Sequence, residues 1–140
     1  MRKIALVALA TVVLAGCTGL ATGQTSPKTT MVMVNTENPA RPWIWIDQEP
    51  IIVRGKAVTI VWQIGTAGYE FPDNGIVFDP KTTPKDEFQC KLGDTKERQT
   101  FECLNRNSKQ PARYKYTITL RATQGQAQPR PLDPTVVNDR

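Results

Sequence analysis

Apolar and polar side chains alternate most regularly between residues 113 and 121. Tyr114, Tyr116, Ile118 and Leu120 fall on one face of an extended chain, and charged or hydroxylated residues occupy the positions between them. A period of two is typical of a strand in a sheet with one buried and one solvated face. The pattern therefore predicts a β-strand here, with its tyrosines in the core.

Shorter apolar segments, separated by Pro, Gly, Asn and Asp, predict the other strands. They are residues 31–36, 43–47 with a continuation past Pro50 at 51–54, 57–64, 75–78, 88–92 and 100–104, with a last edge strand at residues 135–138. The apolar positions of residues 57–64 alternate, which places Trp62 in the core. No long segment after Cys17 has a helical period. Seven to eight short strands in about 110 residues predict an all-β fold, a single β-sandwich.

Composition divides the chain into three parts. Residues 1–16 have the features of a signal peptide, which are described below. Residues 17–30 are mostly small or polar, so they bury too little apolar surface to order themselves, and we expect a flexible tether. Residues 31–140 contain all the predicted strands and have the size of one domain.

The N-terminus has a basic start, Met1-Arg2-Lys3, an apolar run to Leu14, and small residues before Cys17. This order is typical of a secretory signal peptide, and the run is too short to span a bilayer comfortably. The segment Leu14-Ala15-Gly16-Cys17 resembles the lipobox of bacterial lipoproteins. The alternative is an ordinary signal peptide with a coincidental cysteine.

The lipobox resemblance implies cleavage before Cys17 and a diacylglycerol thioether on its sulfur. The chain would then be exported and anchored to the membrane through this lipid. Thr18 follows the cysteine, and it is not the Asp that favours retention in the inner membrane of Gram-negative bacteria. By the same resemblance we expect the outer membrane, with the domain facing the periplasm.

Two further cysteines, Cys90 and Cys103, remain after Cys17 is assigned to the lipid. In an oxidising compartment a remaining even pair usually forms a disulfide, here within a hairpin. Closing this ring is worth roughly 3 kcal/mol in the chain-entropy model. A pair of free thiols or a metal site is the alternative.

The charge of the chain argues against nucleic acid as a partner. Removal of residues 1–16 takes away Arg2 and Lys3 and no acidic residue, so the net charge falls from +5 to +3. A net charge of +3 on one domain is too small to indicate a nucleic-acid binding surface. It favours anionic surfaces such as lipid headgroups or glycan polymers only weakly, and ordinary solubility charge is the simpler interpretation.

The residues for catalysis or cofactor binding are missing from the sequence. There is no histidine, the commonest general base and transition-metal ligand. The acids Asp73, Asp79, Asp86 and Glu87 show no paired spacing and are interpreted as solvated loop charges. Ser108 lies in a polar loop with no visible base. We therefore expect no enzyme and no cofactor.

Two stretches resemble cupredoxin-type domains, Glu49–Trp62 and Arg113–Thr117. The first has the order strand, glycine turn and hydrophobic strand, and the second is similar to the strand that leads to a copper-binding loop. The resemblance implies a cupredoxin-like β-sandwich, although immunoglobulin-like sandwiches share such patterns. Thr117 stands where the ligand thiolate is expected, and the chain has no imidazole, so the copper ligands are lacking.

Trp43 and Trp45 alternate with Ile44 and Ile46, so both faces of this strand are apolar. One interpretation is a central strand that is covered on both sides. The other is an exposed pair of indoles that forms a binding surface, because tryptophan is enriched at binding hot spots.

The combined features predict a non-enzymatic, membrane-anchored lipoprotein. Its β-sandwich would serve as a protein-interaction or accessory module of a bacterial envelope assembly. One alternative is an inhibitor, since small envelope lipoproteins with disulfides include inhibitors of host lysozymes. Another is a carbohydrate-binding module, which depends on Trp43 and Trp45 alone.

Overall fold

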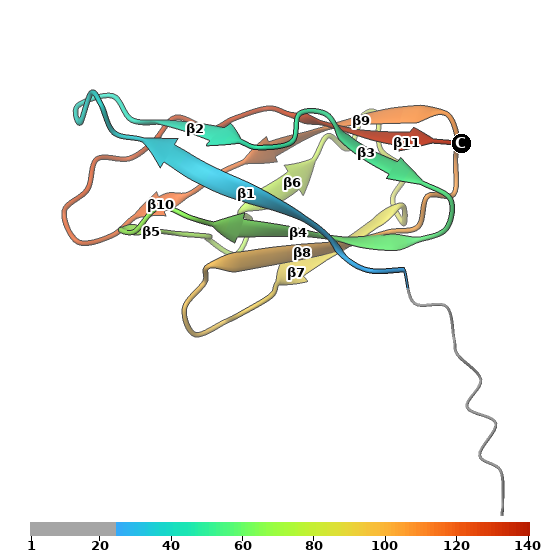
Figure 1. Ribbon diagram of the computed structural model, residues 1–140, viewed down its shortest axis with the longest axis horizontal. Coiled ribbons are helices and arrows are strands. Elements are labelled where there is room, and N and C mark those ends of the chain that lie inside the picture. The colour runs from blue at the N-terminus through green and yellow to red at the C-terminus, as the bar shows by residue number, and fades with distance from the viewer. Residues whose placement is uncertain (1–24) are drawn as a thin grey trace, which may run out of the picture.

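The computed structural model describes residues 25–140, and Figure 1 shows them as two layers of β-strands packed face to face. One layer is a five-stranded sheet in the order β2-β1-β4-β8-β7. The other is a four-stranded sheet in the order β3-β11-β9-β6, and a separate pair, β10-β5, lies near one end. The predicted all-β sandwich is confirmed, with more strands than expected.

The strands of the five-stranded sheet are β1 (Lys28–Asn35), β2 (Trp43–Ile46), β4 (Val58–Ile64), β7 (Phe88–Leu92) and β8 (Thr100–Asn105). Those of the other sheets are β3 (Ile51–Arg54), β5 (Tyr69–Glu70), β6 (Ile76–Phe78), β9 (Ala112–Ile118), β10 (Arg121–Ala122) and β11 (Thr135–Asp139).

Each layer contains one parallel pair of strands. In the five-stranded sheet β1 runs antiparallel to β2 but parallel to β4, with Val32 opposite Ile64. In the other sheet β11 runs parallel to β3 and antiparallel to β9. The prediction of an edge strand at residues 135–138 is therefore wrong, because β11 has a neighbour on both sides and its Val136 is fully buried.

The core lies between the two sheets and is rich in aromatic side chains. The indole of Trp62 on β4 packs edge-on against Tyr116 on β9, with ring centroids 5.3 Å apart. Its Nε1–H donates a hydrogen bond to the Tyr116 hydroxyl at 3.2 Å, so the largest core side chain also satisfies its polar atom. The predicted burial of Trp62, Tyr114 and Tyr116 is confirmed.

The first strand begins earlier than predicted, whereas most of the other predicted boundaries differ by at most a single residue. β1 begins at Lys28, so the last residues of the expected tether belong to the sheet. Thr30 there is fully buried and donates a hydrogen bond to Asp47 Oδ1 at 2.7 Å, which an apolar pattern does not reveal.

The expected strand at residues 113–121 is divided in two. The ladder of β9 ends at Ile118, and residues 121–122 pair instead with β5. Leu120 remains buried at the break, so the apolar face continues although the hydrogen-bonding partner changes. The expected signal peptide and Cys17 lie outside the described residues. From residue 25 onward no helix is long and apolar enough to cross a membrane.

Candidate functional site

The two tryptophans proposed as a binding surface lie on β2, at the edge of the five-stranded sheet. Trp43 is 49% exposed and Trp45 is 40% exposed, whereas Ile44 between them is buried. Because successive side chains of a strand point to opposite faces, both indoles project from the outer face of the sheet. The interpretation of a strand covered on both sides is therefore wrong.

Two methionines of β1 share this outer face with the tryptophans. Met33 is the register partner of Trp45, and Met31 lies two residues before Met33 on the same side. Both are half-buried, and their neighbour Val32 is fully buried on the inner face. We call Met31, Met33, Trp43 and Trp45 the Trp–Met face.

Gly65 makes room for the methionine side chains at the end of β4. A Cβ atom at this position would lie 2.4 Å from the Sδ of Met33 and 3.0 Å from the Cε of Met31. The thioethers thus cover the backbone at Gly65 instead of extending into solvent. This glycine is explained by a close approach, which the sequence pattern alone did not indicate.

The composition of the Trp–Met face is typical of the centre of a protein interface. Aromatic residues and Met are enriched there, and charged residues are depleted. Methionine adapts to irregular surfaces because its side chain is unbranched and polarizable. Of the other exposed large apolar residues, Val77 and Ile52 lie on the other sheet, and Leu104 lies on β8 of the same sheet.

A buried polar network lies at the opposite end of β1 from Trp43, where β1 begins and β8 ends. Its centre is Glu87, which is 2% exposed, so the interpretation of this residue as a solvated loop charge is wrong. The Glu87 carboxylate accepts hydrogen bonds from the backbone N–H of Ser108 at 2.9 Å, from the Ser108 hydroxyl, and from Asn138 Nδ2 at 3.0 Å. Asn138 also accepts a hydrogen bond from Asn105 at 2.7 Å.

The network joins three separate elements without a cation. Glu87 precedes β7, Asn105 ends β8 and Asn138 belongs to β11, so the contacts connect both sheets. Ser108 therefore faces a carboxylate that the sequence did not reveal. Among the described residues, none of the ion pairs includes Glu87, and the carboxylate is held by neutral donors alone. Its evident effect is to fix the loop 106–111 against the sandwich.

Tyr114 adds an unsatisfied group beside this network. Its hydroxyl is buried and has no hydrogen-bond partner among the described residues. Burial raises the pKa of Tyr114 above its ordinary value of 10.0, and the Glu87 carboxylate adds to the shift. Burial also raises the pKa of Tyr116. The hydrogen bond from Trp62 lowers this pKa, but by less than burial raises it.

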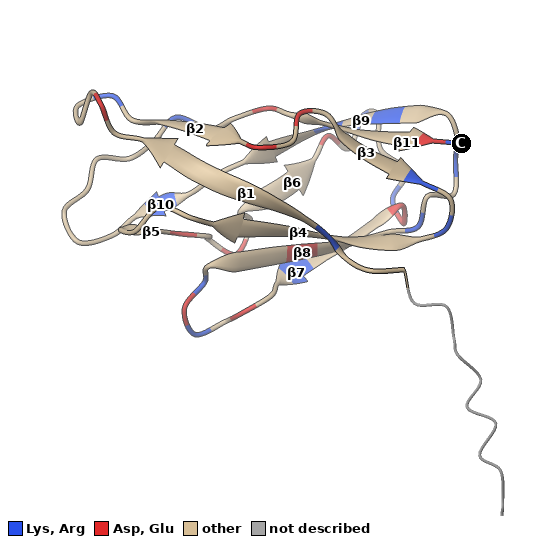
Figure 2. Ribbon diagram, viewed as in Figure 1, with Lys and Arg blue, Asp and Glu red and all other residues tan. Residues whose placement is uncertain are grey.

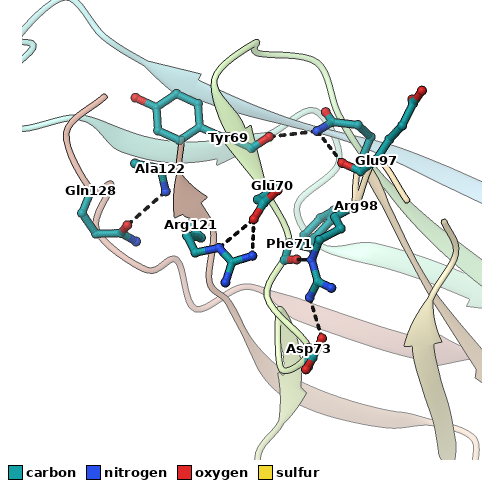
Figure 3. Close-up of polar contacts among 10 residues, drawn as sticks. Tyr69, Glu70, Phe71, Asp73, Glu97, Arg98, Arg121, Ala122 and Gln128 are labelled. Carbon is teal, nitrogen blue, oxygen red and sulfur yellow. Dashed lines mark hydrogen bonds and ion pairs between the residues drawn. The ribbon is translucent and has the colours of Figure 1, made fainter. Parts of the chain in front are cut away.

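The other end of the sandwich is held by exposed ion pairs, shown in Figure 3. Arg98 donates to the Phe71 carbonyl at 2.7 Å and forms an ion pair with Asp73 at 2.5 Å. Arg121 Nε donates to Glu70 at 2.7 Å. The Arg98 guanidinium, through its hydrogen bond and its charge, holds the pKa of Asp73 below its ordinary value of 3.8.

Beside these ion pairs the surface has an open hollow of about 520 Å³, bordered by Tyr69, Glu70, Gln99 and Thr123. Gln99 Nε2 donates a hydrogen bond to the Tyr69 carbonyl at 3.0 Å, so its amide is engaged in holding the loop. Within residues 25–140 no group of three or more His, Cys, Asp or Glu side chains is placed to hold a metal ion.

The predicted pairing of Cys90 with Cys103 is present as a disulfide across β7 and β8. Cys103 is fully buried, whereas Cys90 on the edge strand is exposed.

In comparisons with known proteins, no family model matches the chain, and no curated protein shows significant similarity to it.

Proposed function

We propose that this chain is a non-enzymatic envelope lipoprotein that binds another protein through its Trp–Met face. The observation that carries the proposal is the exposure of Trp43 and Trp45, side by side on an edge strand and next to two methionines. Large exposed apolar residues that adjoin one another usually mark a contact surface. Tryptophan in particular is enriched among the residues that dominate binding energy.

The anchor in this proposal comes from the sequence before the domain. The lipobox resemblance at Leu14-Ala15-Gly16-Cys17 supports export and a lipid on Cys17. Thr18 supports the outer membrane as the destination and the periplasm as the compartment of the domain. A disulfide in the domain fits an oxidising compartment.

A carbohydrate-binding module is the second candidate, and the same exposed indoles favour it. Indole faces can pack against sugar rings, and the carbohydrate hypothesis required at least one of the two to be exposed. The methionines distinguish the two candidates, because adaptable thioethers are typical of protein interfaces.

Site-specific photo-crosslinking in cells tests the proposal. A photoreactive phenylalanine analogue replaces Trp45, and the matched control replaces Val77, which is 46% exposed on the other sheet. We expect discrete crosslinked proteins from position 45 only, and their loss when Trp43→Ala is added. Equal crosslinking from both positions, or none from position 45, would contradict a protein partner at this face.

Purified glycans distinguish the second candidate. If peptidoglycan or another envelope polysaccharide retains the wild-type chain but not the Trp43→Ala/Trp45→Ala variant, the carbohydrate function is correct. The variant must keep the thermal unfolding midpoint of the wild type, which we expect because both indoles lie on the outer face.

A further inference from the structure

The charged side chains divide unevenly between the two ends of the sandwich. The end where β1 begins, here called the basic end, consists of Lys28 with the segments 54–57, 85–87, 106–113 and 139–140. It carries eight Lys and Arg residues and three Asp and Glu residues. The rest of the chain from residue 25 carries eight basic and ten acidic residues. The net positive charge of the domain is therefore confined to one end, as Figure 2 shows.

The acidic residues of the basic end neutralise little of this charge on the surface. Glu87 is buried in the polar network, and Asp139 forms an ion pair with Arg54 at 3.0 Å. Asp86 is exposed beside Lys85, so it offsets one of the eight basic side chains. Lys56, Lys109 and Arg113 are exposed, and the ion pairs of the described residues include none of them. These three side chains thus present their charges directly to solvent.

The chain enters the domain at this same end. Thr25 donates a hydrogen bond to the Ala57 carbonyl at 2.8 Å, so the first described residue lies beside the turn that carries Lys56. Cys17 precedes Thr25 by eight residues, and a chain of this length reaches at most about 28 Å when fully extended. A lipid on Cys17 would therefore hold the basic end, more than any other part of the domain, close to the bilayer.

We propose that the basic end docks onto anionic lipid headgroups and orients the domain on its membrane. This inference rests on the proposed lipid anchor, and it assigns a second, electrostatic contact beside it. A lipid chain with a basic surface is a recognised combination for stable membrane attachment. Charges within about 10 Å of an anionic surface are the ones that contribute, because salt screens the others.

The docked orientation has a consequence for the Trp–Met face. Trp43 pairs with Asn35, seven residues along β1 from Lys28, which corresponds to about 23 Å at the rise of a β-strand. With the basic end on the membrane, the tryptophans project into the compartment and stay free for a partner. Figure 1 shows β2 at the opposite side of the molecule from the start of β1.

Flotation of the chain with lipid vesicles tests the contact without the anchor. The chain from Thr18 onward lacks the lipid but keeps every residue that the structure describes. It is mixed with vesicles of phosphatidylethanolamine and phosphatidylglycerol, or with neutral phosphatidylcholine vesicles. We expect binding to the anionic vesicles only, and its loss in about 0.5 M salt.

Two charge-reversal variants locate the contact. The first is Lys56→Glu/Lys109→Glu/Arg113→Glu at the basic end, and the matched control is Arg41→Glu/Lys96→Glu/Arg130→Glu at the other end. All six side chains are exposed, and both variants change the net charge equally. We expect a roughly hundredfold weaker affinity for the first and a change of only a few-fold for the control. Thermal unfolding verifies that both remain folded.

Equal losses in the two variants would overturn the inference, because only total charge would then matter. Binding to neutral vesicles would overturn it as well, and so would a soluble anionic glycan that binds the basic end more tightly than the vesicles do. Mass spectrometry of Cys17 and crosslinking from position 45 test the proposed function separately. A lipidated, crosslinking protein with no vesicle contact would therefore disprove this inference alone.

Discussion

The two ends of the sandwich hold their loops by opposite means. At the basic end a buried carboxylate is satisfied by a serine and an asparagine, with no cation within the described residues. At the distal end, defined by the ion pairs Arg98–Asp73 and Arg121–Glu70, the contacts lie at the surface. Asp73 has 91% of its side chain exposed, in contrast to the 2% exposure of Glu87.

This difference indicates where the stability of the loops resides. A buried group that loses its partner suffers the full cost of desolvation, whereas an exposed ion pair exchanges its partner for water. The basic end should therefore respond strongly to single substitutions, and the distal end should respond weakly and in a salt-dependent way. The four predictions below test this contrast, beginning with the largest effect.

Glu87→Ala should lower the free energy of unfolding by about 4 kcal/mol, because it leaves Ser108 N–H and Asn138 Nδ2 buried without an acceptor. Chemical denaturation measures the change. Glu87→Gln keeps the volume but directs an NH₂ group toward other donors, so it should cost about 2 kcal/mol. A Gln variant as stable as the wild type would show that the carboxylate is not needed.

The Cys90→Ala/Cys103→Ala variant should lose about 3 kcal/mol, since the disulfide restricts the unfolded chain. The bond lies close to the network, because Phe88 and Asn105 are two register pairs along from the two cysteines. Thermal unfolding with and without reductant measures this effect in the wild type. Equal midpoints under both conditions would contradict a stabilising bond.

Tyr114 and Tyr116 form a matched pair, two residues apart on β9. Tyr116→Phe should cost about 1 kcal/mol, because the Trp62 indole N–H loses its acceptor. Tyr114→Phe removes a buried hydroxyl that has no partner among the described residues, so its stability should equal or exceed that of the wild type.

The tyrosine prediction also has a pH dependence. The raised pKa of Tyr114 means that the folded state favours the protonated hydroxyl. The contribution of this shift to the free energy of unfolding is complete below pH 10, and it is lost as the pH rises through the higher folded pKa. Tyr114→Phe should therefore lose less stability above pH 10 than the wild type does. A steeper loss in the variant would argue against the assignment.

The smallest effect is expected at Asp73. Its lowered pKa means that the pair with Arg98 contributes above pH 3.8, and that this contribution disappears as the pH falls through the lower folded pKa. A carboxyl titration by NMR should give a midpoint below 3.8, and Arg98→Met should return it toward that value. High salt should have a similar effect, because the carboxylate is exposed.

The sequence predicted most strands from their short apolar segments, whereas the most regular alternation, residues 113–121, extended past the end of β9 at Ile118. Residues 51–54 and 88–92 match β3 and β7 at both ends. β5 and β10 were missed because each is only two residues long and has no period to detect. The central place of β11 was also missed, because pairing partners depend on contacts between distant segments and not on the pattern within a strand.

For the candidate site, the sequence identified the tryptophans but not their environment. Ile44 and Ile46 give both faces of β2 an apolar character, and only the position of the strand at a sheet edge decides which face is exposed. Glu87 has the composition of a surface loop, and its partners lie 21 and 51 residues further along the chain. No local signal could have predicted its burial.

The central place of β11 also governs the order in which the domain can form. β3 and β9 do not pair with each other, and the strand that joins them, β11, follows both of them in the sequence. Ile51 on β3 can pair with Val136 only after residues 135–139 have been synthesised. Until then β3 and β9 have no strand between them, and the four-stranded sheet is incomplete. For the exported protein that we propose, the complete sandwich can therefore form only after residues 135–139 have been made, which favours folding after transport across the membrane.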